Sequence, residues 1–429
     1  MSALMNMRLQ LKYDYQLVIY SCFARLGSAT TPPSGPTGEI MQLTETIESN
    51  AARRITQASR RPATLGSTPA DAVALSMGEP DSGTPRVVVD AAVAALHAGR
   101  TRYTNLTGDP SLRDALAEKL TSSAGRPISS EQIVVTHGGS AGLAATMLAL
   151  VDPGENVLIP EPTYSLYADH AAMVGANTIW VPNRADGGLD LEALEEQAAT
   201  ARMIVLCNPG NPTGRVYSTA DLDQLTRILR HHPELVLLAD EAYGDIVFEG
   251  TQFRSALSFV DVADQVVVCS TFSKSYAMTG WRVGYVVATP DIASRVNLLH
   301  RTVNGSINTF VQDAAAVALA ITDTDLRETA RSYQLRRDLV VAALDGVAGL
   351  SMLPPQGAFY AFVAIDSDLT SDEMTARFAD GGVVVRSGSE FGPSGEGYVR
   401  LSFATDPDTL REGLRRFLVV AGQITHPRR

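Results

Sequence analysis

The sequence feature that most constrains the fold is a series of short apolar segments that alternates with helical patterns from residue 133 onward. Several of these segments are continuous runs of Val, Ile and Leu, without alternating polar residues. Strands that are covered on both faces have this composition, because neither side of such a strand meets water. The sequence therefore predicts an α/β fold in which helices cover a sheet of about seven mostly parallel strands. The expected strands span residues 133–136, 157–159, 178–181, 203–207, 235–239, 266–270 and 283–288.

Helical periodicity fills the gaps between these strands and changes in character near residue 308. Helices are expected first over residues 45–61, 85–98 and 111–120, and then between the strands over 141–151, 189–197 and 219–230. Beyond residue 308, long helical patterns at 310–320 and 326–344 precede short strands at 358–364, 383–386 and 398–403, separated by further helices. The change of pattern indicates a second, smaller α+β domain.

We predict four parts along the chain. Residues 1–40 form an N-terminal extension, which includes a Gly- and Pro-rich stretch at 27–38 and is expected to be flexible. Residues 41–80 join the small domain, 81–309 form the large domain, and 310–429 form the small domain.

The composition is that of an ordinary globular chain, since 45% of the 429 residues are hydrophobic and 19% are charged. The formal net charge of −12 argues against nucleic acid or an anionic membrane as a partner. Two of the three cysteines lie in apolar runs, so we expect buried free thiols and a reducing, cytoplasmic location. The apolar run at 17–24 is shorter than the roughly 18 residues of a membrane span and lacks a clean cleavage site. We therefore expect neither a membrane span nor a signal peptide.

One lysine, Lys274, stands in a hydroxyl-rich turn directly after the expected strand at 266–270. A lysine that follows a buried strand loses part of its hydration, which lowers its pKa and frees its amine for Schiff-base chemistry. The hydroxyls of Thr271 and Ser273 and the guanidinium of Arg282 can bind a phosphate close to that amine. Pyridoxal phosphate (PLP) needs this combination of an amine and a phosphate site. The alternative is an ordinary strand-turn-strand with an exposed lysine.

Two further motifs follow expected strands. Residues 208–214 read Asn-Pro-Gly-Asn-Pro-Thr-Gly and would place the amide of Asn211 at the carboxyl end of a strand, where α/β sheets bind ligands. Asn and Pro are also simple turn formers. Asp240 ends another strand, and a carboxylate there needs a partner, such as a pyridinium nitrogen or, alternatively, the start of a helix. Tyr243, three residues on, would place its phenol beside the ring hydroxyl of such a ligand.

Three more candidates each have a structural alternative. Gly139 and Ser140 open a helix after a strand, which can bind a phosphate, although many such turns are glycine-rich. Tyr164 follows the strand at 157–159 and would stack on a flat ring, or serve as an ordinary aromatic residue. Arg400 lies within an apolar strand, where a buried arginine binds either a substrate carboxylate or a structural salt-bridge partner.

Together, these motifs resemble the class I/II aminotransferases, the PLP-dependent enzymes of fold type I that include aspartate aminotransferase. The resemblance extends from about residue 44 to residue 417. Its most specific parts are Ser273-Lys274 with the Met-Thr-Gly-Trp-Arg-Val-Gly-Tyr run at 278–285, and then the motif at 208–214. The resemblance implies PLP as the cofactor and transfer of an amino group from an L-amino acid to a 2-oxo acid.

The resemblance also implies a role for each candidate residue. Lys274 would form the Schiff base with PLP and act as the general base, and Asp240 would pair with the ring nitrogen. Asn211 and Tyr243 would hold the ring oxygen, and Arg400 would bind the substrate carboxylate near the backbone of Gly78. The other implied cofactor-binding residues are Gly139, Ser140, Ala141, Tyr164, Thr271, Ser273, Arg282 and, reaching into the neighbouring subunit, Tyr103.

This last residue implies a homodimer with shared active sites, in which Asn308 also approaches the site across the dimer. Arg301 lies in a region suited to a second substrate carboxylate. The same motifs would also serve an enzyme that eliminates or replaces a β or γ substituent, as in 1-aminocyclopropane-carboxylate synthase. A third possibility is the aminotransferase-like domain of a transcription regulator, but the acidic chain leaves too little room ahead of the fold for a basic winged-helix domain.

Overall fold

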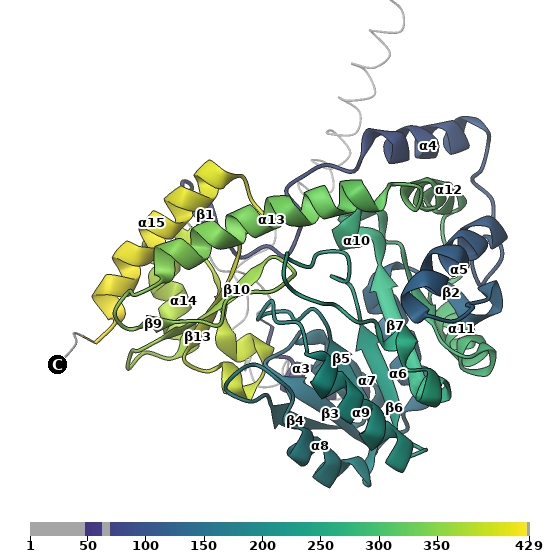
Figure 1. Cartoon of the computed structure of the whole chain (residues 1–429), viewed down its shortest axis with the longest axis horizontal. Helices are drawn as coiled ribbons and strands as arrows, with labels where there is room; N and C mark the ends of the chain where they lie inside the picture. The colour runs from purple at the N-terminus through teal and green to yellow at the C-terminus, as the bar shows by residue number, and fades with distance from the viewer. Residues whose placement is uncertain (1–47, 62–68, 427–429) are drawn as a thin grey trace, which may run out of the picture. The chain divides into compact units, whose positions relative to one another are not determined.

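The central feature of the computed structural model is a seven-stranded sheet with the strand order β2-β8-β7-β6-β5-β3-β4 (Figure 1). Neighbouring strands pair in parallel, except that β8 is antiparallel to both β2 and β7. The prediction of an α/β sheet of about seven mostly parallel strands is confirmed. The strands are β2 (Ile133–Thr136), β3 (Asn156–Glu161), β4 (Asn177–Pro182), β5 (Ala201–Cys207), β6 (Val236–Asp240), β7 (Val266–Thr271) and β8 (Gly284–Val287). The structure describes residues 48–61 and 69–426, so the predicted extension over 1–40 lies outside the described residues.

Both faces of this sheet are buried, which explains the continuous apolar runs. In β7, Val266 and Val268 point into one hydrophobic core, whereas Val267 and Cys269 point into another. The first core is completed by α4 (Arg86–His97), α5 (Pro110–Ala124), α8 (Leu191–Ala198), α9 (Thr219–His231) and α12 (Thr309–Ala318). The second is completed by α6 (Gly138–Leu150), α7 (Leu166–Val174) and α11 (Pro290–Asn304).

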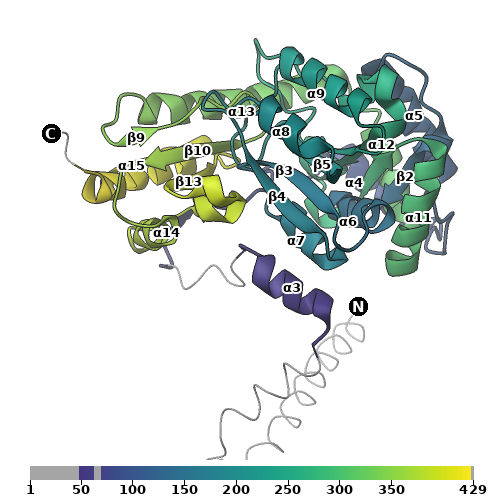
Figure 2. The ribbon, with the colours of Figure 1, turned by 90° about the horizontal axis from the view of Figure 1, so that it is seen from below.

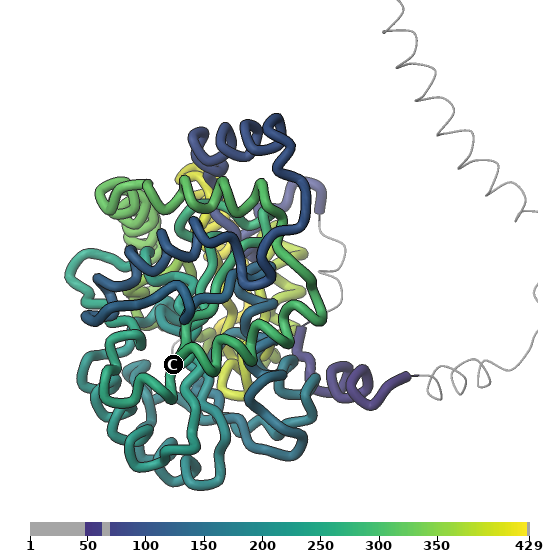
Figure 3. Tube along the Cα trace, turned by 90° about the vertical axis from the view of Figure 1, so that its right-hand side faces the viewer, coloured from purple at the N-terminus to yellow at the C-terminus, as the bar shows by residue number. Residues whose placement is uncertain are grey.

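The helices begin where local signals favour a start. Asp109 caps α5 by accepting a hydrogen bond from the backbone N–H of Ser111, and Pro110 occupies the first turn. Helix α6 begins at Gly138, three residues before the expected start, and the positive φ of 76° at this residue suits glycine. Helices α4 and α5, drawn in blue in Figure 3, lie beside α12.

A second sheet, with the order β12-β13-β10-β9, is antiparallel throughout. Its strands are β9 (Leu350–Ser351), β10 (Tyr360–Ile365), β12 (Arg386–Ser387) and β13 (Tyr398–Ser402). Three helices pack around it: α13 (Asp323–Leu344), α14 (Ser371–Asp380) and α15 (Pro407–Ile424). The single strand expected over 383–386 is two strands, because the chain leaves β11 (Val383–Val384) at Val385 and enters β12 in a different sheet.

The N-terminal part of the described chain touches both regions. Strand β1 (Val73–Ala74) pairs in parallel with β11, and Leu75 lies in the same core as β10 and α15. Helix α3 (Asn50–Ala58) packs on α7, where Arg54 donates a hydrogen bond from Nε to the carbonyl of Ala172 over 2.8 Å (Figure 2). The domain boundaries given above stay a prediction. Across residues 48–61 and 69–426, no helix combines the length and the apolar character needed to cross a membrane.

Candidate active site

A cavity of about 410 Å³ lies at the carboxyl ends of the parallel strands and is lined by residues from both sheets. Asn211 follows β5, Asp240 ends β6, Lys274 follows β7, and Arg400 comes from β13. Parallel strands deliver the residues at their carboxyl ends to one edge of a sheet, which is where such folds bind ligands. The cavity brings together most of the predicted site residues: Gly78, Gly139, Ser140, Tyr164, Asn211, Asp240, Tyr243, Thr271, Ser273, Lys274, Arg282 and Arg400.

Lys274 stands in α10 (Phe272–Ser275), a single helical turn after β7. The Thr271 side chain caps this turn by accepting a hydrogen bond from the backbone N–H of Ser273. Lys274 Nζ donates to the carbonyl of Gly78 over 2.6 Å. Burial, followed by the positive charge of Arg400, lowers the pKa of Lys274 to about 8. Roughly a tenth of this amine is therefore uncharged at pH 7 and about half at pH 8, and the uncharged form is the one that nucleophilic or base chemistry requires.

Asp240 is a buried carboxylate at the end of β6. Its Oδ2 accepts a hydrogen bond from the Tyr167 hydroxyl over 2.7 Å, and its Oδ1 accepts one from the backbone N–H of Ala242 over 3.1 Å. Burial raises the pKa of Asp240, and these two hydrogen bonds and the charge of Lys274 oppose the shift. Among the described residues, no cation lies within salt-bridge distance of this carboxylate, so a cationic ligand group would be its natural partner.

Arg400 is a buried guanidinium that faces the cavity. Its Nη1 donates to the amide oxygen of Asn211 over 3.0 Å, and its Nη2 donates to the carbonyl of Ser76 over 2.7 Å. The rings of Tyr360 and Phe391 lie 4.4 and 4.9 Å from its central carbon. Its Nε is buried without a hydrogen-bond partner, and within the described part of the chain no carboxylate forms an ion pair with it. The structure thus holds an arginine that is oriented by neutral groups and retains a free donor.

The start of α6 and Arg282 together form a small cradle beside Lys274. Gly138 passes so close to Arg282 that a Cβ on this glycine would lie 2.5 Å from Nη2. Arg282 itself has a left-handed backbone with a φ of 55°, and its Nη1 donates to the carbonyl of Thr279 over 2.8 Å. Backbone N–H groups at a helix start and a nearby guanidinium are a favourable site for an anion such as phosphate.

Aromatic residues complete the cavity wall. The hydroxyls of Tyr243 and Tyr360 are 2.8 Å apart, and burial raises the pKa of Tyr243 well above its usual value, so its phenol stays protonated. Tyr164 also lines the cavity and packs edge-on against Tyr167 with ring centroids 5.6 Å apart. A flat ring placed between these groups would meet both apolar faces and hydroxyl donors.

Two of the predicted cofactor-binding residues are not among the lining residues of this cavity. Ala141 lies one residue further into α6 than Ser140. Tyr103 is 97% exposed in the loop between α4 and α5. Asn308 lines a neighbouring cavity of about 630 Å³, which shares Arg282 with the first cavity, and Arg301 lies in α11.

Several lining residues have no counterpart among the predicted ones. Tyr167 lies three residues beyond Tyr164 in a helix that was not among those expected, and that spacing is its only sequence signal. Tyr360 belongs to an expected strand, where an inward-facing tyrosine is usually part of the core. The others, which include an ion pair between Arg386 and Glu390, are Arg61, Ser76, Met77, Glu79, Leu143, Ser165, Cys207, Ala242, Thr279, Arg386, Glu390 and Phe391.

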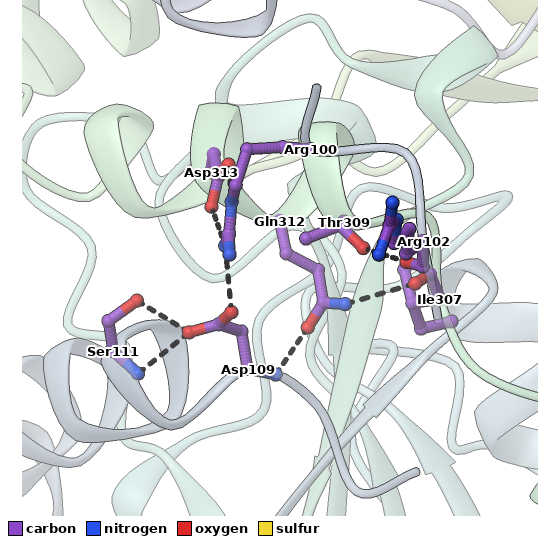
Figure 4. A network of polar contacts seen from close by, with 8 residues as sticks. All are labelled: Arg100, Arg102, Asp109, Ser111, Ile307, Thr309, Gln312 and Asp313. Carbon is purple, nitrogen blue, oxygen red and sulfur yellow. Dashed lines mark hydrogen bonds and ion pairs between the residues drawn. The ribbon is translucent and has the colours of Figure 1, made fainter. Parts of the chain in front are cut away.

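The loop that carries Tyr103 is tied to α12 by a polar network (Figure 4). Arg100 donates to both carboxylate oxygens of Asp313, over 2.8 and 2.7 Å, and to Asp109 over 3.0 Å. The buried side chain of Gln312 accepts from the backbone N–H of Asp109 over 2.6 Å. The network fixes both ends of a loop whose exposed tyrosine points away from its own core. Its remaining bonds join Thr309 to Arg102, Gln312 to Ile307 and Ser111 to Asp109.

Residues 70–417 match the family model described as aminotransferase class I and II. The chain belongs to this family. The putative aminotransferase YugH of Bacillus subtilis is 35% identical over 363 residues, which cover 82% of this chain and 93% of that protein. The arginine–pyruvate transaminase AruH of Pseudomonas aeruginosa is 34% identical over 356 residues, which cover 82% of this chain and 90% of that protein.

Solved structures of aminotransferases are similar to this structure. The crystal structure of the aromatic aminotransferase from Pyrococcus horikoshii has a TM-score of 0.80 and 31% identity, and the match covers 87% of this chain and 99% of that one. The predicted fold type I and the predicted aminotransferase activity are confirmed, and elimination or replacement chemistry is not favoured. The names of these relatives refer to different amino acids, arginine in one and aromatic amino acids in the other, so family membership alone does not identify the substrate.

Proposed function

We propose that this aminotransferase uses PLP to move the amino group of an L-amino acid to a 2-oxo acid, as a cytoplasmic homodimer with shared active sites. The observation that carries the proposal is that Lys274, Asp240 and Arg400 meet around one cavity although they lie far apart in the chain. Family membership supports the choice of cofactor, and the buried free thiols of Cys207 and Cys269 support a reducing compartment.

The residues around the cavity fit PLP in three respects. Asp240 is a buried carboxylate without a cation in contact among the described residues, and a protonated ring nitrogen would supply one. The cradle of Gly139, Ser140 and Arg282 would hold the phosphate, with the hydroxyls of Thr271 and Ser273 beside it. Tyr243 and Asn211 would hold the ring oxygen, and Tyr164 would stack on the ring.

When bound, PLP withdraws electrons from the α-carbon of the amino acid joined to it. Lys274 would hold the cofactor between turnovers, and its amine, with a pKa of about 8, can take a proton from that carbon and return it. Asp240 would keep the positive charge on the ring nitrogen. Arg400 would bind the α-carboxylate through the part of its guanidinium that faces the cavity and so orient the α-carbon toward Lys274.

The proposed homodimer accounts for the exposure of Tyr103 on a single subunit. Its loop is held rigidly at both ends, and the cavity beside Arg282 that Asn308 lines is open to receive a side chain from another subunit. We propose that Tyr103 of each subunit reaches the phosphate site of the other. The exposed apolar side chains of Val87, Val93 and Leu96 on α4 support burial of this region by a second copy.

The test is to present single amino acids to the PLP-loaded protein without any 2-oxo acid. Conversion of PLP to pyridoxamine phosphate, with release of a stoichiometric 2-oxo acid, establishes transamination and identifies the donor. Turnover that leaves PLP unchanged would instead indicate elimination or replacement.

The sequence simplifies the assignment of the lysine, since it contains only Lys12, Lys119 and Lys274. Borohydride reduction followed by peptide mapping should place the cofactor on Lys274, and Lys274→Ala should abolish both labelling and turnover. Lys119→Ala is the matched control, because Lys119 Nζ is 3.0 Å from the Tyr276 hydroxyl and does not line the site cavity. Labelling that persists in Lys274→Ala would disprove the assignment.

A further inference from the structure

A second arginine, Arg386, faces the same cavity as Arg400. The two residues are register partners on the antiparallel strands β12 and β13. Side chains that lie directly opposite in an antiparallel pair project from the same face of the sheet, with Cβ atoms about 5 Å apart. The substrate end of the cavity therefore contains two adjacent guanidinium groups.

The two guanidinium groups differ in their partners. Arg400 bonds only neutral oxygens, whereas Arg386 donates to Glu390 Oε2 through Nε over 2.9 Å and also through Nη2. The Arg386 and Glu390 side chains are 16% and 6% exposed. Since removal of either member of such a buried pair leaves an uncompensated charge, the pair resists separation. Arg386 is thus neutralised in place, and Arg400 is left as the cation available to a carboxylate.

We propose that the Arg386–Glu390 pair masks the second arginine, so that the site selects amino acids whose side chains are uncharged. This inference rests on the proposed function. A second substrate carboxylate would have to displace Glu390 from Arg386 or lie beside its negative charge. A cationic side chain would meet the positive charge of Arg400, which forms no ion pair with a carboxylate among the described residues. The nearby rings of Tyr164, Tyr360 and Phe391 offer an apolar surface to a side chain without charge.

Arg61 is a further arginine that lines this cavity, apart from Arg282 in the phosphate cradle, and it is exposed at the end of the described segment 48–61. It could bind a second carboxylate without disturbing the Arg386–Glu390 pair. The test therefore needs an Arg61 variant as well as variants of the pair.

The experiment measures binding of two probes to the PLP-loaded protein by calorimetry. Maleate carries two carboxylates, and 3-phenylpropionate carries one carboxylate and an apolar group. The wild-type protein should bind 3-phenylpropionate more tightly than maleate. Glu390→Gln should preserve the shape of the pair and unmask Arg386, so the dissociation constant of maleate should fall by about tenfold or more, with less than about twofold change for 3-phenylpropionate.

Further variants keep the inference falsifiable. The double variant Arg386→Gln with Glu390→Gln should return maleate affinity to the wild-type value, and Arg61→Gln should leave both affinities unchanged. Tighter binding of maleate by the wild-type protein, no gain in Glu390→Gln, or loss of maleate binding in Arg61→Gln would each overturn the inference. If Glu390→Gln does not fold, the wild-type probe preference and the Arg61→Gln result still decide the question.

A panel of amino acids separates this inference from the proposed function. Transamination with a preference for aspartate, glutamate, lysine or arginine would refute the inferred selection of uncharged side chains while supporting the aminotransferase proposal. Transamination with a preference for uncharged side chains supports both. If no amino acid converts PLP to pyridoxamine phosphate, the proposed function itself fails.

Discussion

Lys274 lies among two guanidinium groups and two carboxylates whose charges act on it in opposite directions. Arg400 and Arg282 lower its pKa, Glu79 and Asp240 raise it, and burial is the largest influence. The balance leaves the amine near the point of half-ionisation at slightly alkaline pH. Its reactivity therefore depends on groups that would themselves bind ligands.

We expect the rate of PLP uptake by the cofactor-free protein to rise with pH and to level off above a midpoint near 8, because only the neutral amine reacts with a carbonyl. Arg400→Gln removes a nearby positive charge and should move the midpoint to higher pH. Stopped-flow absorbance across a pH series measures both. Arg415→Gln, whose side chain is 63% exposed beside Glu412, is the control and should leave the midpoint in place. An identical midpoint in Arg400→Gln would contradict this account.

The buried carboxyl group of Glu241 leads to a prediction about how stability depends on pH. Burial raises the pKa of this carboxyl to about 7, against the hydrogen bonds that it accepts from Ser255 Oγ and the backbone N–H of Ala256. The unfolded chain ionises at lower pH than the folded one, so stability falls as pH rises from about 4.5 to about 7. The loss is about 3 kcal/mol at higher pH.

Glu241→Gln removes the ionisation and keeps the hydrogen bond from the backbone N–H of Ala256, while its amide N–H would donate to Ser255 Oγ in place of the bond that Glu241 accepts. We expect its free energy of unfolding in urea to exceed that of the wild-type protein at pH 8 and to match it more closely at pH 5. Glu249→Gln, at an exposed position, should follow the wild-type protein at both values. Equal pH dependence in the wild-type protein and Glu241→Gln would show that Glu241 is ionised in the folded state.

The site depends on two points in the fold at which a strand is followed directly by a helix. Strand β2 leads through His137 into α6, and β7 leads into the single turn of α10. Both transitions occur at the same edge of the sheet, so the start of α6 and Lys274 face one cavity. The close approach of the α6 start to Arg282 makes Gly138 the most sensitive backbone position in this arrangement.

Gly138→Ala should raise the dissociation constant of PLP by about tenfold or more, since its Cβ would displace Arg282 from the helix start. Gly154→Ala is a matched control, because Gly154 also has a positive φ, 89°, but open space around it. Both variants should lose about 1 kcal/mol of stability from backbone strain, and only Gly138→Ala should lose cofactor affinity. Equilibrium dialysis with PLP measures the affinity. Equal PLP affinities in the two variants would show that the cradle does not bind the phosphate.

For the molecule as a whole, the sheet could be predicted because burial on both faces produces unbroken apolar runs such as that of β7. The apolar run at 383–386 was wrongly predicted to be a single strand, because nothing in its sequence marks the change of sheet at Val385. The Arg386–Glu390 pair could not be predicted, because its place in the cavity depends on the pairing of β12 with β13. Asp240, Asn211 and Lys274 could be placed at the cavity because each follows an identifiable strand.

The proposed dimer leads to a prediction that depends on residues from both subunits. Lys274→Ala and Tyr103→Ala should each be nearly inactive as homodimers. A hybrid with one subunit of each kind should regain one wild-type site if Tyr103 acts across the dimer, giving up to half the wild-type activity. Co-expression with two different affinity tags yields the hybrid. Absence of recovery in a confirmed hybrid would show that Tyr103 does not serve the neighbouring site.

The guanidinium of Arg400 is held by the carbonyl of Ser76 and the amide of Asn211, which are 324 and 189 positions away in the chain. In protein engineering, the proposed carboxylate anchor therefore cannot be transplanted as a single module. A chimaera that exchanges the C-terminal third with that of a relative would import a new arginine and its strand but would keep the old carbonyl and amide that aim it. Recombination boundaries should therefore move the segment around β1 and the loop after β5 together with β13, so that the arginine and both of its supports come from one parent.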